Sequence, residues 1–184
     1  MAFIKVVGQD EAEGELAEAY EQVAGKRGQV SNVLAVQSLD PKAMLAHLEL
    51  YRQVMFSTEG LSRREREVLA VAVSKANGCA YCVSHHRAAL ASHSSEEFAA
   101  AVAKGEEHDE MTGREKILIM YAELQTATPL ADPQAIISLR IQQLSDLELL
   151  QATQVVAYFN FVNRMVLALG VRLEGDDGAS GDKH

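Results

Sequence analysis

Hydrophobic residues recur at helical spacing along almost the whole chain. In one segment after another, apolar residues fall three or four positions apart with polar residues between them, as in helices that bury one face. Strand-like alternation does not continue beyond the first residues, which we interpret as an extended arm over 1–8. The pattern predicts one or two helical turns within 30–39 and helices over 10–24, 40–56, 62–76, 79–93, 95–104, 112–124, 133–142 and 145–169.

Signals that start and stop helices lie at these boundaries. Ser62 with Glu65, and Thr112 with Glu115, have the spacing of a capping box, in which a side chain and the backbone bond each other at the first turn. Glycine and asparagine tolerate the backbone angles at which helices end. Stops and turns are therefore expected at Gly105 and Gly170, and within 25–28, 77–78 and 129–133.

The predicted fold class is all-α, a bundle of helical hairpins in a single domain over 1–173. A chain of 184 residues is long enough to bury one hydrophobic core. We find no repeat or linker that would divide it. The polar segment EGDDGASGDKH, 174–184, is expected to be a disordered tail.

Composition and charge narrow the classes of partner. The chain is 48% hydrophobic and 23% charged, as in ordinary globular proteins, and its net charge is -9. An acidic chain is poorly suited to bind nucleic acid or an anionic membrane. It has no signal-peptide pattern and no apolar run of about 18 residues, the minimum for a membrane helix. We expect a cytoplasmic protein with no nucleic-acid or membrane partner.

The chemistry of the sequence is concentrated at its two cysteines, Cys79 and Cys82, with His85 and His86 close behind. In a reducing cytosol such a pair is typical of redox, catalytic or metal-binding function rather than of a structural disulfide. The free N–H groups at the start of a helix favour thiolates, so we expect a lowered pKa for both thiols. Helical spacing also places Cys82 beside Cys79 and beside both histidines.

The preceding helix can supply a carboxylate to this cluster. The short turn at 77–78 predicts two antiparallel helices, with His86 opposite the earlier one. A carboxylate there could orient the imidazole, which could then move a proton to or from a thiol. The helical wheel leaves both Glu65 and Glu67 open as that acid.

The run Glu67-x11-Cys79-x2-Cys82-x3-His86 resembles the signature of the AhpD-like, carboxymuconolactone decarboxylase superfamily. The wider stretch LSRREREVLAVAVSKANGCAYCVSHH is most similar to its peroxidase-related branch, as are the opening FIKVV and the ending NFVNRMVLALGV. The resemblance implies an all-α fold that assembles as a dimer, trimer or hexamer. It also implies thiol-dependent reduction of hydroperoxides or of a partner's disulfide.

Carried onto this chain, the resemblance makes Cys82 the cysteine that peroxide oxidises to a sulfenic acid. Cys79 becomes the partner that donates a proton and closes the disulfide, His86 the relay histidine, and Glu67 its carboxylate. Tyr81 stands where AhpD itself often has a histidine, and a phenol does not exchange protons near neutral pH as an imidazole does. The decarboxylase members lack the cysteine pair, so lactone decarboxylation is disfavoured.

The leading prediction is thus a cysteine-based peroxidase that an unidentified thiol or dithiol reduces. The hydroperoxide would bind in an apolar pocket near Cys82. One alternative is a zinc module built from Cys79, Cys82, His85 and His86, and another is a redox sensor without efficient turnover. No dinucleotide or phosphate-binding loop is present, so no organic cofactor is expected. His85 is expected at the surface or at a subunit contact.

Overall fold

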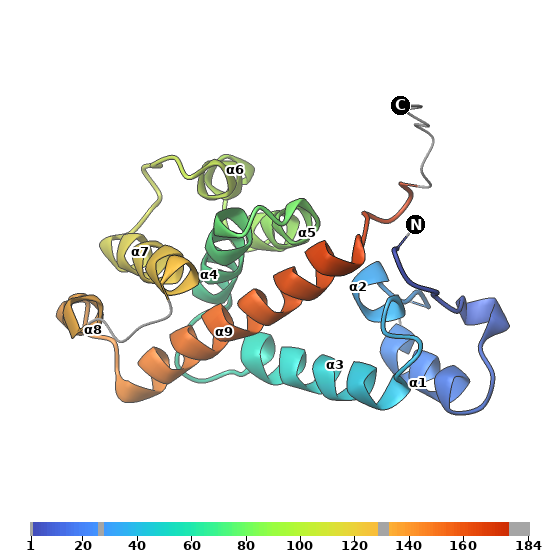
Figure 1. Ribbon diagram of the computed structural model, residues 1–184. Coiled ribbons are helices and arrows are strands. Elements are labelled where there is room, and N and C mark those ends of the chain that lie inside the picture. Colours follow the sequence, from blue (N-terminus) through green and yellow to red (C-terminus); the bar gives the residue numbers. More distant parts are fainter. Residues whose placement is uncertain (1, 26–27, 129–132, 177–184) are drawn as a thin grey trace. The chain divides into compact units, whose positions relative to one another are not determined.

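The computed structural model describes residues 2–25, 28–128 and 133–176, and over these residues it is helical without a strand (Figure 1). The all-α prediction is therefore confirmed. The elements are a 3-10 turn Gln9–Glu11, α1 Gly14–Ala24, α2 Asn32–Ala35, α3 Pro41–Phe56, α4 Arg63–Ala76, α5 Ala80–Ala91, α6 Glu96–Lys104, α7 Gly113–Ala127, α8 Pro133–Ile141 and α9 Asp146–Leu169.

The predicted helices are present, with differences at their ends. The first one begins at Gly14 rather than at residue 10, because Ala12 and Glu13 have extended backbone angles that separate α1 from the 3-10 turn. Cys79 is the N-cap of α5 rather than its first residue, and α5 ends at Ala91, two residues early. Much of the turn at 25–28, the loop at 129–133 and the tail 174–184 lies outside the described residues.

The capping boxes form as predicted. The Ser62 hydroxyl accepts from the N–H of Glu65 at 3.2 Å, and the Glu65 carboxylate accepts from the N–H of Ser62 at 2.8 Å. Thr112 and Glu115 make the same pair of bonds at 3.1 Å and 2.9 Å. Both helix starts, those of α4 and α7, are thus fixed by local sequence.

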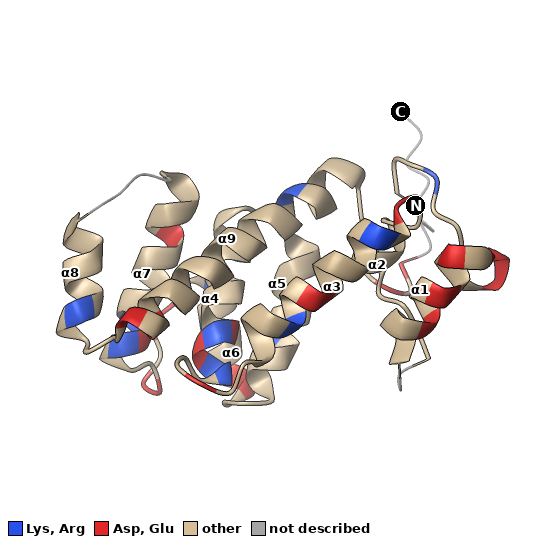
Figure 2. Cartoon of the chain, turned by 90° about the horizontal axis from the view of Figure 1, so that it is seen from below, with Lys and Arg blue, Asp and Glu red and all other residues tan. Residues whose placement is uncertain are grey.

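The chain forms two compact units, of which unit 1 comprises Met1–Arg52 and Arg164–His184. Its arm is held by Val7, whose carbonyl accepts from the Tyr20 hydroxyl at 2.7 Å and whose N–H donates to Ser38 Oγ at 3.0 Å. The acidic residues of α1 are exposed, as expected of a solvated face (Figure 2). The core of unit 1 consists of Ala19, Tyr20, Leu34, Met44 and Leu48.

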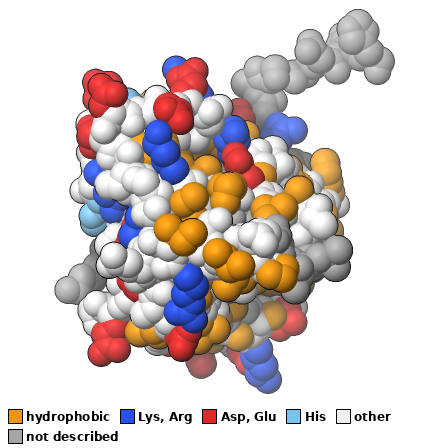
Figure 3. Space-filling view, turned by 90° about the vertical axis from the view of Figure 1, so that its left-hand side faces the viewer, with side chains coloured by type: hydrophobic (Ala, Val, Ile, Leu, Met, Phe, Trp, Pro, Cys, Tyr) orange, Lys and Arg blue, Asp and Glu red, His pale blue; other side chains and the backbone are white. Residues whose placement is uncertain are grey.

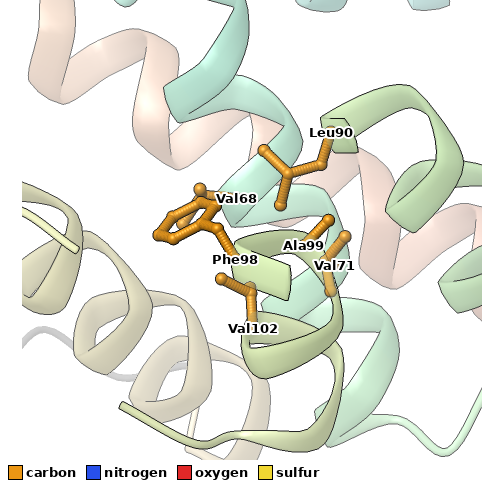
Figure 4. Packing of buried hydrophobic residues seen from close by; sticks show 6 residues of the cluster. All are labelled: Val68, Val71, Leu90, Phe98, Ala99 and Val102. Atoms are coloured by element: carbon orange, nitrogen blue, oxygen red, sulfur yellow. The ribbon is translucent and has the colours of Figure 1, made fainter. Parts of the chain in front are cut away.

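Unit 2, Gln53–Asn163, is built around α4, which packs against α5, α6 and α7 (Figure 1). One core cluster joins α4, α5 and α6, with its side chains pointing toward one another (Figure 4). Its buried members are Val68, Val71, Leu90, Phe98, Ala99 and Val102.

The turn between α4 and α5 fixes how those two helices meet. Gly78 has φ 66°, a left-handed angle that glycine adopts without steric cost, and this reverses the chain within two residues. Asn77 is the C-cap of α4 and Cys79 the N-cap of α5. The predicted helical hairpin is therefore present, and it places the start of α5 against the buried face of α4.

No helix within the described residues combines the length and the apolar character that crossing a membrane requires.

Candidate active site

The cysteine pair lies at the start of α5, sealed inside unit 2. Cys79 is fully buried and the Cys82 residue is 3% exposed, and both are free thiols. The backbone of Cys79 is held on both sides, because its N–H donates to the Ser74 carbonyl at 2.9 Å and its carbonyl accepts from Val83 at 3.0 Å. The pair is therefore fixed by the hairpin and by the first turn of α5.

The two sulfurs form a hydrogen-bonded pair with unequal acidity. The hydrogen bond from the Cys82 thiol lowers the pKa of Cys79 to about 7, against the opposing effect of burial, and the N–H groups of Cys82 and Tyr81 add to the lowering. The same sulfur–sulfur bond, with burial, raises the pKa of Cys82. The lowered pKa of Cys79 agrees with the prediction and the raised pKa of Cys82 does not, because a hydrogen bond between two sulfurs favours the thiolate of one and disfavours that of the other.

Beside the thiols lies a carboxylate–imidazole pair. Glu67 on α4 is fully buried, and its Oε2 is 2.7 Å from Nδ1 of His86 on α5. An ionised carboxylate can only accept, so Nδ1 carries the hydrogen and the neutral ring has its lone pair on Nε2. The ring of His86 also meets Phe159 edge-on, with centroids 4.5 Å apart. The imidazole is thus oriented by two neighbours, one polar and one aromatic.

The relay pair and the thiol pair occupy one region of the hairpin. His86 follows Cys82 by one helical turn, so the two side chains project from the same face of α5. Glu67 approaches that face from α4. The structure therefore pairs Glu67 with His86 and Cys79 with Cys82, and it places His86 one helical turn after Cys82 on α5.

Glu65, the other acid that the helical wheel left open, is placed elsewhere. It closes the capping box with Ser62 and forms an ion pair with Arg114. Of the two glutamates, Glu67 is the one in contact with His86.

His85 and Tyr81 form a separate pair. Their rings stack with centroids 4.3 Å apart, and Nδ1 of His85 lies 2.9 Å from the Tyr81 carbonyl. Tyr81 is buried and His85 is half-buried. The described residues contain no group of three or more His, Cys, Asp and Glu side chains arranged to hold a metal ion, which the zinc alternative requires.

A buried amide on α9 escaped the sequence analysis. Asn163 is fully buried, donates to Ser74 Oγ at 3.2 Å, and accepts from the side chain of Asn77 at 3.0 Å. Its side chain also bonds the Cys82 sulfur and partly offsets the raised pKa of that thiol. The available signal was an asparagine within the apolar stripe that Phe159 and Val166 mark.

Arg63 was also missed. Its Nη2 lies 2.5 Å from Oε1 of Glu67, one helical turn further along α4. The spacing of an arginine four residues before a glutamate could have indicated the ion pair.

The expected apolar pocket beside Cys82 is not the cavity that unit 1 contains. A cavity of about 830 Å³ belongs to unit 1, where the arm, α2 and residues 171–176 line it. None of the four site residues lines this cavity.

Comparison with known proteins shows which family and which solved structures the chain is similar to. The sequence model of the Carboxymuconolactone decarboxylase family matches residues 41–117, a range that contains the cysteine pair and the relay pair. Solved AhpD-like structures also match over nearly the whole chain, as described below. The chain is thus similar to the carboxymuconolactone decarboxylase family over 41–117, and it shares its fold with AhpD-like structures. None of the curated protein sequences is detectably similar to it.

Two of the similar structures are uncharacterized peroxidase-related proteins. The one from Ralstonia eutropha, described as an alkylhydroperoxidase AhpD core, has a TM-score of 0.82 and 24% identity, covering 95% of this chain and 93% of its own. The one from Silicibacter sp. has a TM-score of 0.76 and 25% identity, covering 88% and 85%. The debrominase Bmp8 shares the fold at a TM-score of 0.78 and 17% identity, covering 94% and 92%. The fold thus serves more than one reaction.

Proposed function

We propose that this protein is a thiol-dependent peroxidase that reduces hydroperoxides with Cys79 and Cys82 and moves protons through His86 and Glu67. The observation that carries the proposal is the buried, hydrogen-bonded pair of sulfurs, with an imidazole that Glu67 orients one helical turn further along α5. Thiolate attack on peroxide needs an ionisable sulfur, a second sulfur in reach and a proton donor for the leaving oxygen. The superfamily and its peroxidase-related members support the same reaction class.

In the first step, we assign the attack to Cys82. The Cys79 thiolate accepts the proton of Cys82, and the Cys82 sulfur then bonds the outer oxygen of the hydroperoxide. The O–O bond breaks and Cys82 becomes a sulfenic acid. The alkoxide takes the proton that Cys79 accepted, passed on by His86, and leaves as an alcohol, which restores the Cys79 thiolate. The sulfur is oxidised by two electrons and the peroxide is reduced by two.

In the second step, Cys79 closes the disulfide. Its thiolate, which the lowered pKa of about 7 favours, attacks the Cys82 sulfur and displaces the sulfenic oxygen as hydroxide. The neutral ring of His86 takes up one proton from solvent at Nε2 and passes it to the hydroxide, which leaves as water. An external dithiol then reduces the disulfide, and its own two sulfurs are oxidised. We assign to His86 the transfer of these protons at Nε2, and to Glu67 the fixing of Nδ1.

Stopped-flow consumption of an organic hydroperoxide with a dithiol donor tests the proposal. Cys82→Ser should abolish turnover. Cys79→Ser should allow one turnover and accumulate a sulfenic acid on Cys82, which a dimedone adduct locates by mass spectrometry. Unchanged turnover in Cys82→Ser would refute the peroxidase proposal, and an adduct on Cys79 in that variant would reverse the two roles.

The deep burial of both sulfurs favours a second candidate, a redox sensor with slow turnover. Such a sensor would form the same disulfide but would react with peroxide slowly, because the site must open first. Titration of the reduction potential of the pair together with measurement of the turnover rate separates the two. A reversible disulfide without sustained catalysis would favour the sensor. Either function suits the reducing cytoplasm, which keeps such a pair as dithiol.

We also propose that the protein forms homo-oligomers through an apolar face of unit 2. Seen from the side on which α8 lies in Figure 1, hydrophobic side chains gather on the surface (Figure 3). Exposed apolar residues of α7, α8 and the first turns of α9 include Met120, Ile136, Ile137, Ile141, Leu147 and Leu150. Exposed apolar surface of this kind typically marks an interface. Light scattering on the native chain and on Ile137→Glu tests this, and an unaltered mass in the variant would contradict it.

A further inference from the structure

We propose that Arg63 is a positioning residue of the proton relay: it keeps Glu67 ionised and thereby fixes the hydrogen of His86 on Nδ1. This inference rests on the proposed peroxidase function for its consequence in catalysis, but its structural part can be tested without peroxide.

The need for a counter-charge follows from the burial of Glu67. Its side chain has no exposed surface, and removing an ion from water is costly unless an opposite charge and hydrogen bonds compensate it. His86 satisfies Oε2 at 2.7 Å. Oε1 has no hydrogen-bond donor with suitable geometry among the described residues, yet Nη2 of Arg63 lies 2.5 Å from it. Compensation at Oε1 is thus chiefly the charge of Arg63.

Arg63 is itself held in place. Its Nη1 donates to the Met55 carbonyl at 2.7 Å, and its guanidinium lies over the ring of Phe56, 3.8 Å from the centroid. Both contacts come from the last two residues of α3. The side chain of Arg63 is 21% exposed, so it is shielded without being sealed. A guanidinium fixed by a carbonyl and an aromatic face can direct one N–H edge at a carboxylate.

Neighbouring arginines do not duplicate this role. Arg64 points to Glu115 and Glu110 and lies over Phe98. Arg66, which is buried, donates to backbone carbonyls and to the Gln151 side chain. Of the three arginines on α4, Arg63 is the one that pairs with Glu67.

The consequence for the relay follows from hydrogen-bond roles. Without the guanidinium, a buried carboxylate is stabilised by taking up a proton. A protonated Glu67 donates to Nδ1 of His86, and the ring then carries its own hydrogen on Nε2. In that tautomer Nε2 cannot accept a proton from the thiol side. Arg63 would therefore act on catalysis without touching the reacting atoms.

The direct test is ¹⁵N NMR of histidine-labelled, reduced protein without peroxide. The native chain should show the His86 hydrogen on Nδ1, and Arg63→Met should shift the population to Nε2 or to a mixture. Arg63→Gln, which also removes the charge, replaces Arg63→Met where that variant does not fold and should shift the tautomer in the same direction. Arg63→Lys, which keeps the charge, should stay near the native tautomer. Arg64→Met, with 26% exposure of the native side chain, is the matched control and should leave the tautomer unchanged. A native tautomer in folded Arg63→Met would overturn the proposal, as would equal shifts in Arg64→Met.

A double-mutant cycle tests the catalytic part. Arg63→Met should lower kcat about 10- to 100-fold with KM little changed, since it removes an aid to proton transfer rather than a substrate contact. In a Glu67→Gln background the same substitution should lower kcat by less than about 2-fold, because Arg63 acts through the carboxylate of Glu67 and that carboxylate is already absent. Additive losses would contradict the assignment. An inactive native chain would instead refute the peroxidase function, with the NMR result still deciding the role of Arg63.

Discussion

Two carboxylates of α4, only two residues apart, have opposite environments. Glu65 caps the helix, pairs with Arg114 and faces the ion-pair network that also includes Glu148. Glu67 is fully buried between Arg63 and His86. Glu65 thus caps the start of α4 near the surface, whereas Glu67 bonds the imidazole of His86 in the interior.

The difference shows how burial and partners, rather than residue type, separate a structural acid from a relay acid. A helix turns about 100° per residue, so a step of two positions carries a side chain to nearly the opposite face. The outer face of α4 meets charged side chains from α7 and α9, and ion pairs of that kind contribute little each. The inner face meets α5 and offers Glu67 one imidazole, which makes that contact directional.

The largest expected effect comes from exchanging each acid for its amide. Glu67→Gln should lower kcat of the peroxidase reaction by about 10²- to 10⁴-fold, the usual contribution of a proton-transfer group, while leaving the fold intact. Glu65→Gln is the matched control and should keep kcat within about 2-fold. Steady-state kinetics give kcat for both variants and so show whether the two acids differ in catalysis. Similar losses in the two would mean that the buried acid has no special role.

A second effect concerns the two sulfurs. Because the hydrogen bond from Cys82 is the main cause of the lowered pKa of Cys79, Cys82→Ala should raise that pKa from about 7 back toward the ordinary value for a thiol. Reaction with iodoacetamide requires the thiolate. Its rate in the native chain should therefore rise with pH up to about 7 and then level off. In the variant it should go on rising at higher pH, and coincident pH profiles would disprove the sulfur–sulfur bond.

A smaller effect is expected at the amide that bonds the attacking sulfur. Asn163→Ala removes a donor that favours the Cys82 thiolate and should slow sulfenic acid formation by about 10-fold, the value of one such hydrogen bond. Asn160→Ala is the control, since Asn160 bonds Asn77 and Thr126 rather than a sulfur. Single-turnover stopped-flow rates compare the two. Equal slowing in both would point to loss of packing instead.

The smallest effect should appear in stability, on the outer face of α4. Glu65→Gln weakens the capping box and the ion pair with Arg114, and we expect it to lower the free energy of unfolding by about 1 kcal/mol. Urea denaturation measures this. An unchanged midpoint would show that neither contact contributes to stability.

Much of the fold was predictable because its signals are local. Helical periodicity, the boxes at Ser62 and Thr112, and the turn glycine at 78 depend on residues within a few positions of each other. The cysteine pair and His86 were predictable for the same reason, since they share one helix. The start of α1 was predicted too early. The acidic residues from 10 to 18 give a continuous helix-like composition, but Ala12 and Glu13 have extended backbone angles that interrupt the helix.

The parts that the sequence could not supply depend on contacts between helices. The wheel left both Glu65 and Glu67 open, the family resemblance selected Glu67, and the packing of α5 on α4 puts Glu67 in contact with His86. Asn163 reaches the site from a helix that begins more than sixty residues after Cys82. The opposite pKa shifts of the two thiols arise from a sulfur–sulfur hydrogen bond, whereas their position at a helix start predicted a lowered pKa for both.

One measurement tests the central claim most directly: mass spectrometry of the peptide that spans both cysteines, after one equivalent of hydroperoxide is added to the reduced native chain. The account predicts a loss of two hydrogens in that peptide, with one hydroperoxide consumed per disulfide formed, and a much slower loss in Glu67→Gln. If both thiols stay reduced and open to alkylation while the peroxide persists, the claim that this buried pair is a peroxide-reducing centre is contradicted.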